Sequence, residues 1–592
     1  MLAIIFASLL LIWIYIKVLK PYEYWKNKGV TYVKPWPLFG NMAPVTFRRK
    51  AFSQHLQDLY SADPNKRYIG FYQFLSPTLL IRDPDLIKTI AIKEFSAFPD
   101  HRTFTSEEAD PLGSRNLFAL TAAKGWHDLR ATISPAFTTS KMKLIFGFMD
   151  QCADQFVNYF KKQEGTVIFE TKDAFSRFTN DVIGSTVFGI NCDSLEDREN
   201  EFYLNGKSLA DFSGIKALKF FLSTISPGLV KFFKITFFDE ACNNFYRDII
   251  KNSIKIREEK QIVRPDMIHL LLEARKGRLK HEHQNETIDS GFAVAEESEI
   301  GKSQNRKKAE LTDEDITAQA VAFYFAGFDA VSTLMSFISY ELALNTDIQD
   351  KLREEINAVL ENNSGKITYE AVLGMKYLDC VISEGLRKWP GPFVERVSAR
   401  DYTIKPKYTE EKPLHLKKGS VVWFPLYPIH RDPENYPEPE KFDPERFNEE
   451  NKRNIKPFTY IPFGAGPRNC IASRFALLEA KVITVKIIEN FEIVPVVKTK
   501  IPLEISKSRV DNLPDDGIWY RDESSSQIQA LQQVFSKTSY MARNQSERPT
   551  SSDVFSTLYQ PRAIKKRLIH FLKKHHSDGQ YVFWYDRYDE LF

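Results

Sequence analysis

The stretch FGAGPRNCIASRFA, residues 463–476, places a single cysteine in a loop that contains two glycines and a proline. An apolar helical pattern begins directly after Cys470. The N–H groups at a helix N-terminus favour an anion, so they help a cysteine to stay ionised as a thiolate. Gly464 and Gly466 allow a tight turn and a close approach of the backbone to a flat ligand. Arg468 can reach a carboxylate on such a ligand.

These features are what a haem iron held by one cysteine requires. The alternative is a buried structural thiol, which is the common state of a lone cysteine. The ordered pattern F-x-x-G-x-R-x-C, here Phe463, Gly466, Arg468 and Cys470, favours the ligand, because it resembles the haem-binding loop of cytochromes P450. The resemblance implies heme b with Cys470 as the axial ligand of its iron, and with Phe463 and Arg468 at the cofactor. Two residues after the cysteine, where that family often has glycine, this chain has Ala472.

The composition is that of a large protein with a roomy apolar interior. The chain has 592 residues, of which 43% are hydrophobic and 13% aromatic. A net charge of +4 is small for this length and gives no case for a nucleic-acid partner. The cysteines are odd in number and lack CxxC spacing, which argues against a disulfide framework and against a zinc site; they are Cys152, Cys192, Cys242, Cys380 and Cys470.

The N-terminus predicts a membrane anchor over residues 1–20. Leu2–Ile16 is uncharged and almost wholly apolar, near the lower length limit for crossing a bilayer. A cleaved signal peptide is the rival interpretation, but no basic side chain precedes the run and bulky residues end it. Lysines follow the run, so the positive-inside rule leaves the rest of the chain in the cytosol. The resemblance to cytochromes P450 of the microsomal type implies a location in the endoplasmic reticulum membrane.

Three further boundaries follow from composition and from the resemblance. Residues 21–41 form a proline-marked stiff hinge, and residues 42–521 form one haem domain, mainly α with small β-sheets. Within this domain, residues 276–310 are a polar, mobile connector. Residues 522–592 match nothing in the family, and we expect disorder or a gene-model artefact, with a short amphipathic helix over 562–576 as the alternative.

Two helical segments carry further candidate haem contacts. Lys124–Lys143 is predicted as one helix, with Trp126 and Arg130 on the same face. An ordinary surface pair is the alternative. In the P450 resemblance, this W-x-x-x-R pair donates hydrogen bonds to a haem propionate. Arg396 is assigned to the second propionate, and His430 is similar to a family histidine near the propionates.

A long apolar helix is predicted from Leu311 through Tyr340, capped by Thr312 and Asp315. Its centre resembles the oxygen-binding segment of the P450 family, in which small Ala326 leaves room for the ligand and Asp329 joins a proton path. A solvated or salt-bridged acid is the alternative for Asp329. The family usually has threonine after the acid, whereas this chain has Ala330. Without that hydroxyl, cleavage of the O–O bond should be less well coupled to substrate oxidation, and Thr333 is a partial substitute.

A buried charge network is the expected role of three further residues. Glu384 and Arg387 are three apart on the predicted helix Tyr377–Trp389, and such a pair alone is a weak signal. The segment PERF downstream, which contains Arg446, makes the pair informative. In P450s the matching residues form a network behind the haem. We expect a structural role for all three and no part in catalysis.

The resemblance is closest to insect relatives of the drug-metabolising microsomal P450s. It implies a monooxygenase that inserts one oxygen atom from O2 into apolar small molecules, either xenobiotic or lipid-like. NADPH would supply electrons through NADPH–cytochrome P450 reductase, with cytochrome b5 as a further partner. Candidate reductase contacts are Lys141, Lys143, Lys452, Arg453 and Lys456. Candidate substrate contacts, by position, are Phe323, Ala326, Phe393 and Val394.

Several alternatives stay open at this level. Ala330 gives weight to a P450-fold isomerase or dehydratase that needs no reductase, and a poorly coupled haem protein is the third possibility. The aromatic segment Phe212–Phe238 is either a pair of core helices or a loop that enters the membrane. A strand-rich segment, Ile493–Trp519, is expected to close the pocket.

Overall fold

A computed structural model describes residues 15–524 except 104–106, 164–166, 211–218, 220–231, 235, 237–238, 279–290 and 296–310, together with residues 5, 6 and 8. The predicted anchor and the extension after residue 524 lie largely or wholly outside the described residues, as does most of the aromatic segment Phe212–Phe238. The chain divides into two units, 1–525 and 526–592, and the described structure belongs to the first.

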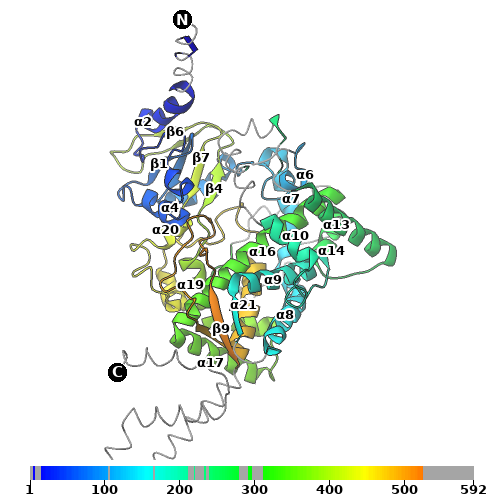
Figure 1. Ribbon diagram of the computed structural model, residues 1–592. Coiled ribbons are helices and arrows are strands. Elements are labelled where there is room, and N and C mark those ends of the chain that lie inside the picture. The colour runs from blue at the N-terminus through cyan, green and yellow to red at the C-terminus, as the bar shows by residue number, and fades with distance from the viewer. Residues whose placement is uncertain are drawn as a thin grey trace, which may run out of the picture. The chain divides into compact units, whose positions relative to one another are not determined.

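The described part is mainly helical, as expected (Figure 1). The longer helices are α4 (Phe52–Tyr60), α7 (Trp126–Ile133), α8 (Thr139–Lys161), α9 (Thr171–Ile183), α10 (Glu201–Ala210), α13 (Glu240–Lys260), α14 (Met267–Arg275), α16 (Asp313–Leu344), α17 (Thr346–Asn362), α19 (Lys376–Lys388) and α21 (Ser473–Asn490). The short ones are α2 (Tyr24–Asn27), α3 (Ala43–Thr46), α5 (Pro84–Lys88), α6 (Pro111–Ser114), α18 (Tyr369–Gly374) and α20 (Leu426–His430).

Three small sheets complete the fold. A four-stranded sheet has the order β1-β2-β7-β4, formed by Tyr68–Gln73, Ser76–Ile81, Val421–Phe424 and Val394–Val397. A three-stranded sheet, β3-β9-β8, joins Val167–Glu170, Trp519–Ser524 and Phe491–Pro495 in antiparallel pairs. β5 (Tyr402–Ile404) pairs with β6 (Leu414–Leu416). β1 and β2 form an antiparallel hairpin.

Helix α16 runs through the centre of the helical part, where α9, α19 and α21 lie around it (Figure 1). Its predicted capping box is confirmed: Thr312 Oγ1 accepts from the Asp315 N–H, and the Asp315 carboxylate accepts from the Thr312 N–H. Among the described helices, α16 alone is long and apolar enough to cross a bilayer. Most of its residues are buried in this fold, which identifies it as a core helix.

The structure corrects three sequence-based boundaries. Lys124–Lys143 is not one helix, because Pro135 lies in a 3-10 turn, Ser134–Phe137, that separates α7 from α8. The expected strand-rich segment Ile493–Trp519 has strands only at its two ends. Strand β9 continues to Ser524, past the predicted domain end at 521. Residues 21–41, predicted as a stiff hinge, include Trp25, which is buried and whose indole N–H donates to the Phe71 carbonyl.

Candidate active site

The cysteine loop is a tight turn held by its own backbone. The Cys470 N–H donates to the Phe463 carbonyl at 2.9 Å, and the Asn469 N–H donates to the Gly466 carbonyl at 2.9 Å. Gly464 and Gly466 both have positive φ, +76° and +73°, which only glycine adopts without strain. Helix α21 begins at Ser473, directly after the loop. The predicted arrangement of loop and following helix is therefore present.

The side chain of Cys470 has accessible surface, although its neighbours Arg468 and Asn469 are buried. Protein atoms pack densely around the sulfur, and this burial raises the pKa of the Cys470 thiol. The Ala472 backbone N–H and the Arg130 charge oppose that rise without overcoming it. A coordinating metal ion deprotonates a thiol outright. The Cys470 thiol therefore suits a role as an iron ligand, because binding to the iron would ionise it, which its protein surroundings alone do not do.

Arg130 binds the residue next to the cysteine. Its guanidinium donates to both oxygens of Asn469, to the backbone carbonyl at 3.0 Å and to the side-chain Oδ1 at 2.9 Å. This fork fixes the planar guanidinium in one orientation. Asn469 was missed by sequence reasoning, although its place inside the cysteine motif was an available signal.

Arg468 lies on the face of the Trp126 ring, with its guanidinium carbon 4.1 Å from the ring centre. Its nitrogens donate mainly to backbone carbonyls, including that of Pro99 at 2.7 Å and that of Leu120 at 2.6 Å. Asp100 is 3.5 Å away. Burial, together with the nearby charges of other arginines, lowers the pKa of Arg468 to about 9.

Arg396 is fully buried on β4, and within the described residues its guanidinium forms no ion pair with a carboxylate. Its two terminal nitrogens donate to the carbonyls of Glu395 and Ala465, and its Nε has no hydrogen-bond partner among the described residues. Burial lowers the pKa of Arg396 to about 10. Burial, together with the charges of Arg396 and Arg468, holds the pKa of His101 well below its usual value. A ligand that carries two carboxylates, as haem does, fits this surplus of buried positive charge.

The middle of α16 presents small residues with accessible surface. Ala326 and Ala330, one helical turn apart, are both exposed, whereas Tyr324, Phe328 and Val331 are buried. An accessible patch in a core helix indicates that this face borders an interior space. The geometry agrees with the prediction that Ala326 leaves room for a flat ligand.

Asp329 and Thr333 both contact one lysine that sequence reasoning missed. Lys172 Nζ, from α9, is 2.8 Å from Asp329 Oδ1 and 2.8 Å from Thr333 Oγ1. It also donates to Ser332 Oγ at 2.6 Å. The structure thus favours the salt-bridged interpretation of Asp329, and it places Thr333 on the lysine side of α16. No local sequence signal links Lys172 to this helix, because the two meet only through tertiary packing.

The expected charge network forms on α19. Arg387 and Glu384 are both fully buried and share two hydrogen bonds, of 2.7 and 2.9 Å. Arg446 Nε is 3.6 Å from Glu384 Oε1. The structure places His430 in this network, because its backbone carbonyl accepts from Arg387 and its Nε2 accepts from the Ile461 N–H. Burial lowers the pKa of His430 to about 3. The expected place of His430 near the haem carboxylates stays a prediction.

The predicted substrate contacts are only partly brought together. Phe323 packs against the main core cluster, with its ring 5.2 Å from that of Phe137. Phe393 instead stacks on Trp423 at 3.8 Å in a second cluster that covers the four-stranded sheet. Val394 lies beside the cysteine loop, within ordinary contact distance of a β-carbon built on Gly464. The structure therefore assigns the two phenylalanines to different cores, which weakens the prediction for Phe393.

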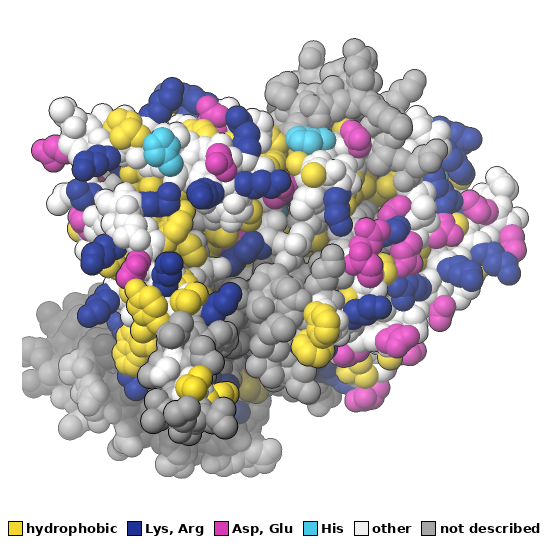
Figure 2. Space-filling model, turned by 90° about the horizontal axis from the view of Figure 1, so that it is seen from above, with side chains coloured by type: hydrophobic (Ala, Val, Ile, Leu, Met, Phe, Trp, Pro, Cys, Tyr) yellow, Lys and Arg dark blue, Asp and Glu magenta, His cyan; other side chains and the backbone are white. Residues whose placement is uncertain are grey.

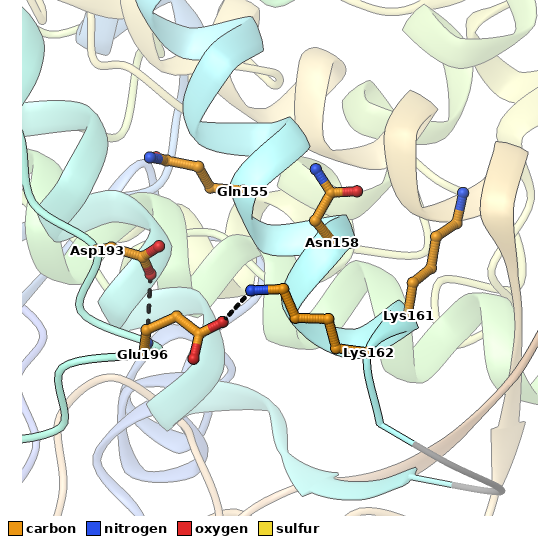
Figure 3. Close-up of a pocket in the computed structure, with 6 residues that line it drawn as sticks. All are labelled: Gln155, Asn158, Lys161, Lys162, Asp193 and Glu196. Carbon is orange, nitrogen blue, oxygen red and sulfur yellow. Dashed lines mark hydrogen bonds and ion pairs between the residues drawn. The ribbon is translucent and has the colours of Figure 1, made fainter.

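A surface pocket of about 380 Å³ lies apart from the candidate site residues (Figure 3). Helix α8 supplies three of its labelled side chains, Lys162 follows the end of that helix, and Asp193 and Glu196 face them. Lys162 forms an ion pair with Glu196 at 2.5 Å. The pocket contains no predicted catalytic, haem or substrate residue, so we assign it no part in the reaction.

One buried carboxyl on α21 gives a stability prediction. Glu479 is fully buried, and neither carboxyl oxygen has a hydrogen-bond partner among the described residues. Burial raises its pKa well above the usual 4.5, so the folded protein binds a proton that the unfolded chain loses. The contribution of Glu479 to the free energy of unfolding is therefore greatest below about pH 4.5, and it falls as the pH rises above that value.

We expect Glu479→Met to raise the free energy of unfolding near pH 7 by about 1–3 kcal/mol, because it removes unsatisfied polar atoms. Glu479→Gln should abolish this pH dependence with a smaller gain, since its amide also lacks partners. Urea unfolding from pH 5 to 8 measures both effects. If the gain in the free energy of unfolding of Glu479→Met did not grow with pH, Glu479 would not be protonated in the folded protein.

The comparisons with known proteins agree with this geometry. A family model described as Cytochrome P450 matches residues 31–515. The chain is 43% identical over 517 residues to Cytochrome P450 9e2 of Blattella germanica, an alignment that covers 84% of this chain and 93% of the relative. It is 41% identical over 511 residues to Probable cytochrome P450 9f2 of Drosophila melanogaster, covering 84% and 94%. The chain therefore belongs to the cytochrome P450 family and is a haem-dependent monooxygenase.

Proposed function

We propose that this monooxygenase oxidises apolar small molecules, xenobiotic or lipid-like, with electrons from NADPH that arrive through a flavoprotein reductase. The observation that carries the proposal is the position of Cys470, a residue with accessible surface, beside the buried guanidinium groups of Arg130, Arg396 and Arg468. Cytochrome b5 is a second candidate electron donor.

Haem, when bound, would supply the activation of O2. Cys470 would hold its iron through the thiolate, and the three arginines would bind its carboxylates. Ala326 and Ala330 leave space along α16, and the absence of polar atoms on their side chains suits an apolar substrate. The carboxylate of Asp329 is a proton-accepting group near this space, and its contact with Lys172 holds it in place.

A basic surface is the proposed contact for the reductase, since electrostatic complementarity speeds the encounter of redox partners. Of the candidates, Lys143 is paired with Glu370, and Lys452 is 2.9 Å from Glu449. Lys141, Arg453 and Lys456 complete the set. A paired lysine presents less net charge, so we expect the reductase to depend more on Arg453 than on Lys452.

The endoplasmic reticulum location remains a proposal that rests on the apolar N-terminus. Figure 2 shows hydrophobic side chains among lysines and arginines on the face seen from above. Exposed large hydrophobic residues in the described part include Trp36, Leu38, Phe47, Phe232 and Phe233. Replacing Phe232 and Phe233 with serine in a chain that lacks residues 1–20 tests their membrane contact by liposome binding.

The carbon monoxide difference spectrum of the reduced protein tests the proposed chemistry, with Cys470→Ser beside the wild type. A strongly red-shifted, thiolate-type band that vanishes in the variant is the expected result. Consumption of NADPH that depends on added reductase would then establish the electron route. A histidine-type band in well-folded wild-type protein would contradict ligation by Cys470 and remove the oxygenase proposal.

A P450-fold isomerase or dehydratase is the second candidate, and Ala330 is the observation that favours it. If the missing hydroxyl limits coupling, Ala330→Thr should raise the amount of product formed per NADPH consumed and lower the release of hydrogen peroxide. Threonine adds little volume at a position that already has accessible surface. An unchanged ratio, with the same peroxide release, would show that another group or a water already does this work. Turnover without reductase or NADPH would favour the isomerase.

Lys172→Met is expected to lower the product formed per NADPH, because it leaves the partly buried Asp329 carboxylate without its cation and frees Thr333 Oγ1. Lys162→Met is the matched control, since Lys162 also pairs with a carboxylate but lies on the surface pocket of Figure 3. Equal coupling ratios in the two variants would exclude a role of Lys172 in holding the acid.

A further inference from the structure

A short turn, Gly291–Ala295, lies between α14 and α16 and packs onto the helical core. We call these five residues, GFAVA, the docked turn. Ala293 is 4% exposed and Val294 packs against the main core cluster. The Val294 N–H donates to the Gly291 carbonyl at 3.2 Å, which closes the turn. The predicted mobile connector over residues 276–310 is therefore wrong at this point, because the apolar run within it finds a partner surface.

The docked turn covers a buried ion pair between α19 and α21. Lys481 Nζ is 2.8 Å from Asp379 Oδ1, and the Lys481 side chain is fully buried. The Phe292 N–H donates to Asp379 Oδ2 at 2.9 Å. A β-carbon on Gly291 would lie 2.1 Å from Asp379 Oδ1, and the φ of Gly291 is +125°. Only glycine therefore lets the backbone lie directly on this pair, where it excludes water and strengthens the attraction.

The docked turn also contacts the chain on both sides of the cysteine loop. Before the loop, the Phe292 ring is 5.4 Å from the ring of Tyr460. After the loop, the Ala295 N–H donates at 3.3 Å to the hydroxyl of Ser473, the first residue of α21. The Tyr460 hydroxyl in turn donates to the Ser383 carbonyl on α19. One short segment thus ties the two ends of the loop that carries Cys470 to the helix behind it.

We propose that the docked turn is an internal brace for the cysteine ligand, with Gly291 and Phe292 as positioning residues. Holding Tyr460 and Ser473 fixes the ends of the loop, and the Asp379–Lys481 pair that it covers fixes α21 against α19. The brace keeps the Cys470 sulfur in the position from which it ligates iron. This inference rests on the proposed haem–Cys470 bond and adds to it the element that maintains the bond.

Gly291→Ala and Phe292→Ala test the brace in the holoenzyme, each with a matched control. Gly277→Ala also places alanine at a positive φ, +68°, before the turn, but its β-carbon would have no atom within 4 Å. Phe146→Ala also removes a partly buried ring that contacts a tyrosine, here Tyr369 on α18. Two quantities are measured: the rate at which the thiolate-type carbon monoxide band of the reduced protein is lost on warming, and the midpoint of thermal unfolding. Hydrogen exchange of the peptide that spans Cys470 is a third readout, independent of the spectrum.

The brace predicts that both test variants lose the thiolate-type band about fivefold faster than wild type or more, and that exchange rises in the Cys470 peptide but not in β1. Phe292→Leu, which keeps an apolar side chain, should restore most of the wild-type rate. Rates equal to those of the controls would overturn the brace. The brace would also be overturned if the band were lost faster only in proportion to a lower unfolding midpoint, as in Phe146→Ala. The docked turn would then contribute general packing only. If wild-type protein shows no thiolate-type band, the proposed function and the brace fall together.

Discussion

Replacing Gly466 with alanine is expected to abolish thiolate-ligated haem in most of the protein. Gly466 has a φ of +73°, and a β-carbon there would lie 1.9 Å from the backbone oxygen of Ala91. That oxygen belongs to the turn Thr89–Lys93, where no flexible side chain can move aside. The loop must therefore shift, and the Gly466 carbonyl that accepts the Asn469 N–H moves with it. Cys470 follows Asn469, so its sulfur leaves the ligating position.

Gly464→Ala is the matched control within the same loop. Its φ is nearly the same, +76°, but the added β-carbon would be 3.7 Å from Val394 and 3.9 Å from Asn469, which are ordinary contacts. Backbone strain alone costs about 1–2 kcal/mol in such a position. We expect Gly464→Ala to retain most of its thiolate-type band and Gly466→Ala to retain little, measured as band intensity per mole of folded protein. Equal retention would show that contact with Ala91 does not govern the loop.

The sequence predicted structure best where the residues that act together lie close together in the chain. The loop from Phe463 to Cys470, the capped start of α16 and the pair Glu384–Arg387 are local patterns, and their geometry is as expected. Local patterns fail when a distant segment supplies the partner. Lys172 reaches Asp329 from another helix, and the docked turn was hidden in a polar connector because five residues are too few to show a period.

Single-residue assignments by position were the least secure. Phe393 follows the helix that carries Glu384, but its ring stacks on Trp423 because the strand β4 turns it toward the four-stranded sheet. The place of His430 near the haem carboxylates, assigned by analogy, stays a prediction, and its Nε2 accepts from the Ile461 N–H. In both cases the side-chain direction depends on tertiary packing, which neither spacing nor composition records.

Glu384→Ala is expected to lower the free energy of unfolding by about 3–5 kcal/mol, because it leaves Arg387 as an uncompensated buried charge. Glu384 is the only carboxylate that the structure records in a salt bridge with Arg387, within the described residues. It also accepts from the Asp443 N–H at 2.9 Å, so its loss frees a backbone donor in addition. Urea unfolding of the holoenzyme measures the loss, and haem retained per mole of protein reports whether the damage reaches the cofactor.

Glu449→Ala provides the comparison, since Glu449 also pairs with a cation three residues away, Lys452, at 2.9 Å. That pair is exposed to water and to salt, so its removal should leave the unfolding curve close to wild type. The spacing and the signs of the charges are alike in the two pairs, so the contrast reports burial together with the further contacts of Glu384 to Asp443 and Arg446. If Glu384→Ala were no worse than Glu449→Ala, water or rearranged side chains would have to compensate Arg387. The charge of Arg387 would then not stabilise the region behind the cysteine loop, and its side chain would contribute packing alone.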